Sequence, residues 1–162
     1  MLKPTKRELR INHLEEVRDK EEAKKSNLQR KTKIRTLQFE WSDGREVGCN
    51  DVEVLEGLEP HPNMEGIRIE NYLGEKFPPW LLMMKIPSDG DSSRVFDNLV
   101  ELMLRTYLPT ATAMRLLSKL TRLRIGGCPF LRENCTKGSG SEWSKISHLP
   151  DIVIQETGLR RV

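Results

Sequence analysis

The chain has 162 residues, of which 36% are hydrophobic and 31% are charged, and its formal net charge is +3. This length and polarity suit one soluble domain, and the longest apolar run, Trp80 to Met84, is far shorter than the roughly 20 residues of a membrane-spanning helix. The start, MLKPTKRELR, carries charge where a secretory signal has its apolar core, so the sequence predicts a cytoplasmic protein. Its three cysteines, Cys49, Cys128 and Cys135, form no CxxC pair, which favours reduced, buried thiols over disulfides or a zinc site.

The positive charge is concentrated near the N-terminus. Residues 1–36 contain 12 Lys or Arg against 6 Asp or Glu, whereas the remaining residues contain 15 against 18. A basic end can attract nucleic acid, an acidic membrane surface or an acidic protein domain. However, the stretch EEVRDKEEAKKSNLQRK interleaves both signs as a solvated helix face does, and no aromatic residue accompanies its basic residues, which argues against a base-stacking nucleic-acid site.

One spacing of apolar residues, LxxLxL, recurs along the chain. In chain order it occurs in KRELRINHL, where lysine takes the first position, and then in IRTLQFEWS, MEGIRIENY, LVELMLRTY, LTRLRIGGC and LPDIVIQET. The alternating LxL pairs predict short strands near residues 9–11, 37–39, 67–69, 102–104, 123–125 and 152–154. The intervals between them are long enough for each strand to pair in parallel with the next, so that stacked repeats bury one another's apolar edges.

The segments between these strands predict short helices and turns. Residues 21–31 and 51–58 have helical patterns, and Asn50 or Asp51 can cap the second helix. Pro60 to Asn63 ends that helix. Tyr72 is expected to cap the turn that leaves its strand, and Phe77 and Trp80 are expected to be buried anchors in the FPPW corner.

Three longer phrases carry a family resemblance: VLEGLEPHPNMEGIRIENYLGEKFPPWL, LQFEWS and CPFLRENCTKGSGSEWSKISHLPDIVI. They closely resemble the C-terminal leucine-rich-repeat region of plant intracellular disease-resistance proteins, the nucleotide-binding leucine-rich-repeat class with an N-terminal coiled coil. The resemblance implies one α/β domain over residues 1–162, a leucine-rich-repeat solenoid with a curved parallel β-sheet and irregular short helices or loops on its convex side. It also implies a recognition module of an innate immune receptor, which senses pathogen effectors directly or through a guarded host protein and helps to keep the receptor inactive.

The chain departs from that family pattern in three ways. It has no GxxxxGK[ST] phosphate loop, so we expect no nucleotide or other cofactor and a fragment that lacks the nucleotide-binding domain. The turn column, where many such repeats carry Asn or Cys, contains no continuous asparagine ladder and reads Leu14, Ser42, Tyr72, Tyr107, Cys128 and Thr157. In addition, PTATAMRLLSK replaces the glycine-containing turn that is usual before the fifth strand.

Binding residues are expected on the concave face of the sheet, where alternate side chains point away from the core. One predicted column comprises Arg10, Gln38, Arg68, Met103, Arg124 and Val153, and its neighbour comprises Asn12, Glu40, Glu70, Arg105, Gly126 and Gln155. The alternative is that these are ordinary solvent-facing positions. A further hypothesis is that the basic N-terminal repeat, including Arg10, Lys24 and Lys25, forms an autoinhibitory contact with a nucleotide-binding domain in cis or in trans.

Other function classes fit the sequence less well. His13, His61 and His148 have no metal-ligand spacing and no GxSxG elbow is present, so we expect no catalytic and no metal site, and interpret His61 as a turn residue. A substrate adaptor of a ubiquitin ligase is the main alternative, but it needs an F-box where this chain already has a repeat. An inactive remnant is the third possibility, because repeats without polar caps expose both ends of the core.

Overall fold

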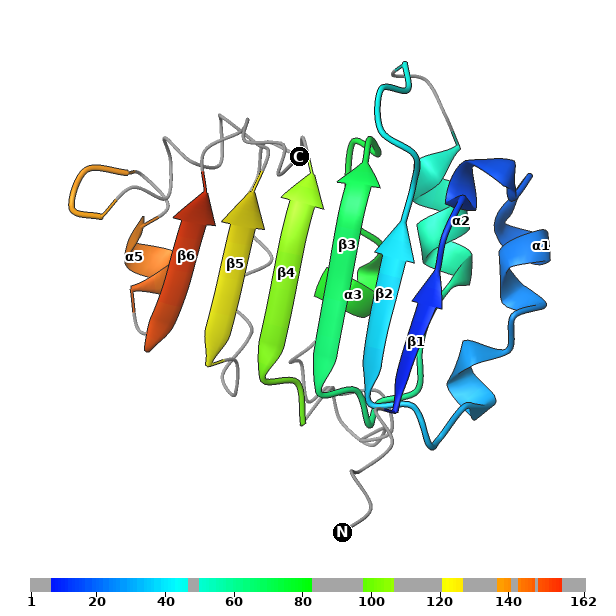
Figure 1. Cartoon of the computed structure of the whole chain (residues 1–162), viewed down its shortest axis with the longest axis horizontal. Helices are drawn as coiled ribbons and strands as arrows, with labels where there is room; N and C mark the ends of the chain where they lie inside the picture. Colours follow the sequence, from blue (N-terminus) through cyan, green and yellow to red (C-terminus); the bar gives the residue numbers. More distant parts are fainter. Residues whose placement is uncertain are drawn as a thin grey trace, which may run out of the picture.

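The computed structural model describes residues 7–46, 50–82, 98–106, 121–126, 137–140, 143–147 and 149–155. Its centre is one six-stranded sheet with the order β1-β2-β3-β4-β5-β6, in which every neighbouring pair is parallel (Figure 1). Each strand contains the LxL segment that predicted it. The strands are β1 (Glu8–Ile11), β2 (Thr36–Glu40), β3 (Gly66–Tyr72), β4 (Glu101–Thr106), β5 (Arg122–Gly126) and β6 (Asp151–Gln155).

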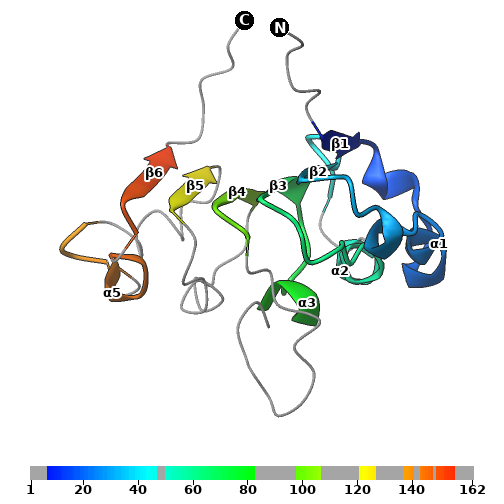
Figure 2. The same ribbon diagram turned by 90° about the horizontal axis from the view of Figure 1, so that it is seen from below.

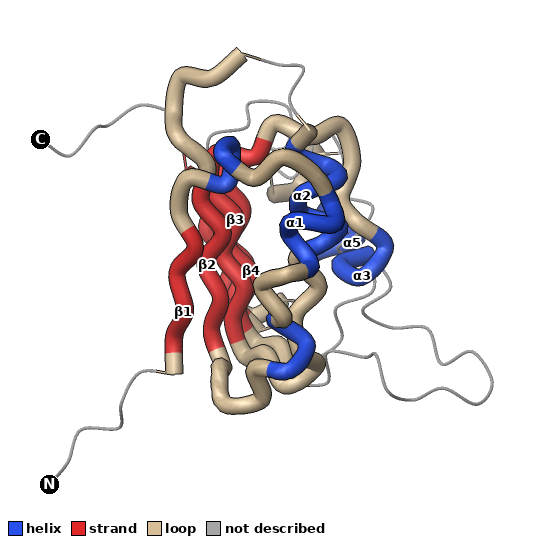
Figure 3. Tube along the Cα trace, turned by 90° about the vertical axis from the view of Figure 1, so that its right-hand side faces the viewer, coloured by secondary structure: helices blue, strands red, loops and turns tan. Residues whose placement is uncertain are grey.

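The helices form a second layer on one side of the sheet. Figure 2 shows the strands along an arc with the helices on its outer side, and Figure 3 shows the two layers from the side. This arrangement confirms the curved parallel sheet with short helices on its convex face. The described helices are η1 (Leu14–Glu16), α1 (Lys20–Lys24), η2 (Leu28–Arg30), α2 (Asp51–Gly57), α3 (Pro79–Leu82) and α5 (Trp143–Ile146).

The strand register places equivalent apolar residues side by side. Leu37 pairs with Ile67, which pairs with Leu102, and all three are buried. The apolar residues of the two outermost strands are only partly buried, because each of those strands has a single neighbour. These edge residues are Leu9, Ile11, Ile152 and Ile154. The side chain of Ile125 and the whole of Leu120 lie outside the described residues.

An aromatic cluster fills the core beneath β2 and β3. The ring of Trp41 meets Tyr72 edge-on, with centroids 5.3 Å apart, and Tyr72 stacks on Phe77 at 5.8 Å. The Tyr72 hydroxyl donates to the carbonyl of Lys76, which confirms its expected role in the turn after the strand. A Cβ at Gly74 would lie 2.2 Å from the Tyr72 hydroxyl oxygen, so this turn can pass over the ring only because it has no side chain there.

The second predicted anchor, Trp80, connects α3 to the sheet and to α2. Its ring lies 6.3 Å from that of Phe39 in β2, and its indole Nε1 donates to the carbonyl of Leu55 in α2 at 2.9 Å. Both predicted anchors, Phe77 and Trp80, are therefore buried as expected.

The single helix predicted over residues 21–31 is wrong. The chain instead forms α1, a turn, and then the 3₁₀ helix η2, with Asn27 in the left-handed conformation at φ 54°. Ala23 and Leu28 are both buried, but residues five apart on a continuous α-helix point in directions about 140° apart. The break turns both side chains towards the core.

The helix predicted over residues 51–58 is confirmed as α2. Asn50 occupies its N-cap position, but the side chain makes no capping bond and instead donates to the carbonyls of Val17 and Arg18. At the other end the helix stops before Pro60. The ring of His61 accepts a hydrogen bond from the backbone N–H of Asn63 at 3.1 Å, which confirms it as a turn residue.

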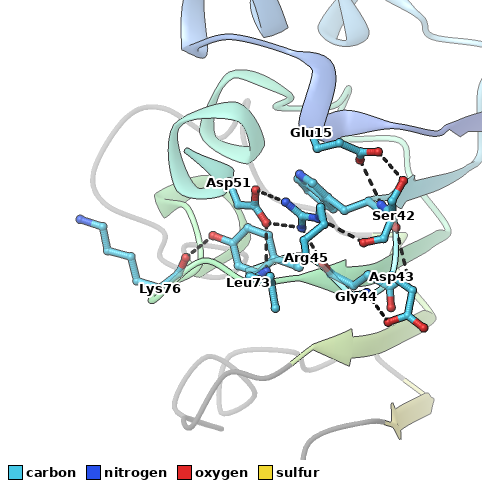
Figure 4. Close-up of polar contacts among 11 residues, drawn as sticks. Glu15, Ser42, Asp43, Gly44, Arg45, Asp51, Leu73 and Lys76 are labelled. Atoms are coloured by element: carbon cyan, nitrogen blue, oxygen red, sulfur yellow. Dashed lines mark hydrogen bonds and ion pairs between the residues drawn. The ribbon is translucent and has the colours of Figure 1, made fainter. Parts of the chain in front are cut away.

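A polar clamp joins the start of α2 to the turns after β2 and β3 (Figure 4). The guanidinium of Arg45 donates to the carbonyls of Ser42 and Asn71, at 3.1 and 2.9 Å, as well as to Asp51. The Asp51 carboxylate also accepts the backbone N–H of Leu73 at 3.0 Å. No pattern in the sequence indicated this clamp.

Candidate recognition face

Three columns of side chains lie on the concave face of the sheet, on the side opposite the helices. We call the middle one the central column; it aligns Arg10, Gln38, Arg68, Met103, Arg124 and Val153 in register, as predicted. The upper column, nearer the carboxyl ends of the strands, aligns Glu40, Glu70, Arg105, Gly126 and Gln155. The lower column aligns Glu8, Thr36, Gly66, Glu101, Arg122 and Asp151.

Polar groups at the β1 end of this face are tightly bonded to each other. The Nε and Nη2 atoms of Arg10 donate to one oxygen of Glu40, at 3.0 and 2.7 Å. Gln38 donates its amide to Glu70 at 3.1 Å and, unlike an ordinary solvent-facing residue, is only 5% exposed. The second oxygen of Glu70 pairs with Arg105 at 3.3 Å, so the network crosses from β1 to β4.

The side chain of Arg105 lies over the neighbouring strand. A Cβ at Gly126 would lie 3.4 Å from Cγ of Arg105, so the aliphatic part of the arginine covers this glycine. A methyl group at position 126 would therefore make an ordinary van der Waals contact with the arginine that reaches towards Glu70.

Arg68 and Arg124 are bonded much less completely. Arg68 has an ion pair with Glu8 at 3.8 Å, and Arg124 has one with Glu101 at 4.0 Å, both longer than a hydrogen bond. The Nε atom of each arginine is shielded from solvent and has no hydrogen-bond partner. These two side chains therefore retain donors that the folded chain does not use.

The lower column contains charges that lie outside the two predicted columns. Arg122 pairs with Asp151 at 3.1 Å and with Glu101 at 3.9 Å, so β4, β5 and β6 are linked across this edge of the face. The same alternation that found the central column would have found these residues two positions earlier in each strand.

The remaining predicted binding residues contribute less to the described geometry. Asn12 follows β1 and is exposed, while Met103 and Val153 are half-buried in the central column. Gln155 pairs with Gly126 through the strand register, but its side chain lies outside the described residues.

The turn column is only partly as predicted. In β3 the residue that bonds the preceding strand is Asn71, one position before the expected Tyr72: its amide donates to the carbonyl of Trp41 at 3.0 Å. Asn71 has φ 60° and is the extra residue of a β-bulge, which explains the shift by one. The predicted positions Tyr107, Cys128 and Thr157 lie outside the described residues, as do all three cysteines and His148.

In the preceding turn a carboxylate takes the place of an asparagine. Glu15 accepts the backbone N–H and the hydroxyl of Ser42, while His13 Nδ1 lies 3.3 Å from both Glu15 and Ser42. Burial would raise the pKa of Glu15, but the hydrogen bonds from Ser42, from the backbone and from His13 lower this pKa to about 2. Glu15 is therefore an ionised hydrogen-bond acceptor that joins the first two repeats.

The basic residues of the N-terminal repeat do not share one surface. Arg10 lies on the concave face, whereas Lys24 ends α1 in the opposite layer and is followed by Lys25. Lys24 also pairs with Glu21 at 2.8 Å. One flat contact cannot include all three residues.

Within the described residues, no three or more His, Cys, Asp or Glu side chains are grouped so that they could hold a metal ion. The same residues include no helix with the length and apolar character needed to cross a membrane.

Comparison with known sequences identifies the family of this sheet. The family described as R13L1/DRL21 LRRs matches residues 1–128. Disease resistance RPP13-like protein 1 of Arabidopsis thaliana is 32% identical over 128 residues, which cover 74% of this chain and 11% of that protein. The chain belongs to the R13L1/DRL21 leucine-rich-repeat family. Its α/β fold is therefore a leucine-rich-repeat solenoid, and β6 extends the sheet in register beyond the matched range.

Other relatives of this R13L1/DRL21 repeat region are also named as disease resistance proteins. Disease resistance proteins RGA2 and RGA4 of Solanum bulbocastanum are 33% identical over 75 residues and 37% identical over 73 residues. These matches cover 45% and 44% of this chain but only 8% and 7% of those proteins, so the chain spans a small part of its relatives. No solved structure matches the chain. The family and the names of these relatives assign the chain to the leucine-rich-repeat region of a plant disease-resistance protein.

Proposed function

We propose that the concave face of this chain is the protein-recognition surface of a cytoplasmic plant immune receptor and that it has no catalytic role. The observation that carries this proposal is the alignment of three charged and polar columns on the face that the helices leave uncovered. Parallel strands hold these side chains at fixed spacings on a rigid scaffold, which favours recognition of a protein surface. The partner is a pathogen effector or a host protein that the receptor guards.

A site-specific photocrosslinker tests this proposal. Met103, in the central column, and Gln29, exposed in η2 on the helical layer, are each replaced by a photoreactive amino acid in the receptor that contains this chain. In plant cells challenged with a pathogen, the crosslinker at position 103 should capture a discrete effector or host protein that position 29 does not capture. Identical sets of adducts from the two positions would argue against a recognition role for this face.

We further propose that the N-terminal repeat contributes to autoinhibition by contacting the nucleotide-binding domain. Because Arg10 and the Lys24–Lys25 pair lie in opposite layers, charge reversal can assign the contact to one layer. If the concave face is in contact, Arg10→Glu should weaken co-purification with a nucleotide-binding domain supplied in trans at low salt, and the double variant Lys24→Glu/Lys25→Glu should not. Unchanged co-purification of both variants would refute the contact.

A further inference from the structure

We propose that Arg68, Met103 and Arg124 together bind an acidic α-helical segment of the partner protein, with two carboxylates on the arginines and an apolar side chain on the methionine between them. This inference rests on the proposed function, because it specifies which partner chemistry the concave face selects.

The first support is the unused hydrogen-bonding capacity of the two arginines. In the same column, the guanidinium of Arg10 has a hydrogen-bond acceptor, because its Nε and Nη2 both donate to Glu40. Arg68 and Arg124 have only ion pairs at 3.8 and 4.0 Å, and neither Nε has an acceptor. The side chains of Arg68 and Arg124 are 32% and 37% exposed, so a ligand carboxylate that reaches the exposed part of each guanidinium can form the short charged hydrogen bonds that these long ion pairs lack.

The second support is the distribution of charge across the face. The central column contains three arginines and no acidic residue. The acidic residues of the face stand in the flanking columns, where each already has an arginine partner; they are Glu8, Glu40, Glu70, Glu101 and Asp151. The charged side chains of the central column are therefore all positive, although the three columns together contain five arginines and five acids, so acidic groups of a ligand are favoured along the middle of the face and not over all of it.

The third support is the spacing, which selects a helix. Arg68, Met103 and Arg124 occupy paired positions on three successive strands, so the two arginines are separated by about 10 Å, twice the spacing between strands. On an α-helix, residues i and i+7 share one face and are about 10.5 Å apart, and residue i+4 lies between them. An extended segment repeats on one face about every 6.8 Å and cannot match this distance.

The test uses the complete 162-residue chain and a synthetic peptide as the probe. The probe is an alanine-based helix of about 20 residues, with glutamate at i and i+7 and leucine at i+4. A matched peptide carries glutamine in place of both glutamates. A third peptide keeps the two glutamates and the leucine of the first, and proline substitutions at other positions keep it extended. Binding is measured by fluorescence anisotropy, and contact with Met103 is followed by the NMR shift of its labelled methyl group.

We expect the acidic helix to bind at least about tenfold more tightly than the glutamine peptide, the change that one hydrogen bond to a charged group typically produces. Arg68→Gln and Arg124→Gln should each weaken binding by a similar factor, and the Met103 methyl resonance should shift. Arg30→Gln removes the same charge from an exposed position in η2 and should leave binding unchanged. Arg68→Lys keeps the charge without the planar donors and should bind with intermediate affinity.

Three results would overturn the inference: equal weakening by Arg30→Gln, equal binding of the extended peptide, or no binding of any peptide to a chain that circular dichroism shows to be folded. If the peptides fail while the crosslinker at position 103 captures a discrete partner, only this inference is lost. If both experiments fail, the proposed function is lost with it.

Discussion

The carboxylate of Asp51 and the guanidinium of Arg45 meet in a two-point contact, with nitrogen to oxygen distances of 3.0 and 2.7 Å. The side chain of Asp51 is 1% exposed and that of Arg45 is 11% exposed, so water screens this pair very little. Asp51 also accepts a hydrogen bond from the backbone N–H of Leu73, and Arg45 donates one to the carbonyl of Asn71. Two consecutive repeats are thus joined by directed polar bonds as well as by apolar packing.

We expect Asp51→Ala to lower the free energy of unfolding by about 3–5 kcal/mol, because it leaves a buried guanidinium without its carboxylate. Urea denaturation followed by circular dichroism measures this loss. Asp43→Ala is the matched control: this acid lies in the loop after β2, near Arg45, is exposed, and among the described residues accepts only the backbone N–H of Gly44, so its loss should be below about 1 kcal/mol. Equal losses from the two variants would show that the clamp is unimportant.

Gly57→Ala should destabilise the chain, although alanine is the better helix former by about 1 kcal/mol. A Cβ at position 57 would lie 2.5 Å from the carbonyl oxygen of Lys20 and 2.7 Å from Cβ of Ala23, so α1 and α2 would have to move apart. We expect a net loss of about 1–3 kcal/mol, visible as a lower melting temperature. Glu53→Ala, at an exposed position of the same helix, should change the melting temperature little. A rise in stability for Gly57→Ala would disprove the close approach of the helices.

The stability of the chain should fall in acid as Glu15 is protonated. Its pKa is lowered from 4.5 to about 2 in the folded chain, so its contribution is complete above pH 4.5 and is lost as the pH falls towards 2. We expect a loss on the order of 1–2 kcal/mol, reduced by the partial exposure of the carboxylate. Unfolding measured at several pH values should show this loss in the wild type and a smaller one in Glu15→Gln and in Ser42→Ala. An unchanged pH profile in both variants would contradict the assignment.

Alkaline conditions should destabilise the chain through Tyr72. Burial raises the pKa of its phenol above the usual value of 10.0, and the charges of Asp51 and Glu56 add to this effect. The unfolded chain therefore releases this proton first, and stability falls as the pH rises above 10. Tyr72→Phe should weaken this dependence and cost about 1 kcal/mol at neutral pH, because the carbonyl of Lys76 loses its hydrogen bond. A fully retained alkaline loss in Tyr72→Phe would rule out Tyr72 as its source.

The sheet and its register could be predicted from the sequence because each strand shows the same alternation. Leu37, Ile67 and Leu102 repeat one position of one pattern, and their burial follows from it. The central column of the concave face could be predicted from the same alternation, because the residue between two buried positions of a strand points to the opposite face of the sheet.

Other features could not be predicted because they depend on contacts between repeats. A buried aspartate such as Asp51 looks like a surface aspartate until the fold brings Arg45 and Leu73 to it. The bulge at Asn71 moves the turn position by one residue, and the LxxLxL pattern ends before that point. The break after α1 follows from the burial of both Ala23 and Leu28, which helical propensity alone does not indicate.

The uniform parallel register also limits how genes for such chains can vary. Deleting one residue inside β3 would reverse its alternation, so that Arg68 would face the core and Ile67 or Ile69 would face water. Duplicating or removing a whole repeat would instead keep every remaining side chain on its own face and only lengthen or shorten the columns. A change in the number of whole repeats is therefore expected to give a new surface on an intact core, whereas the loss of one residue within a strand is expected to cause misfolding.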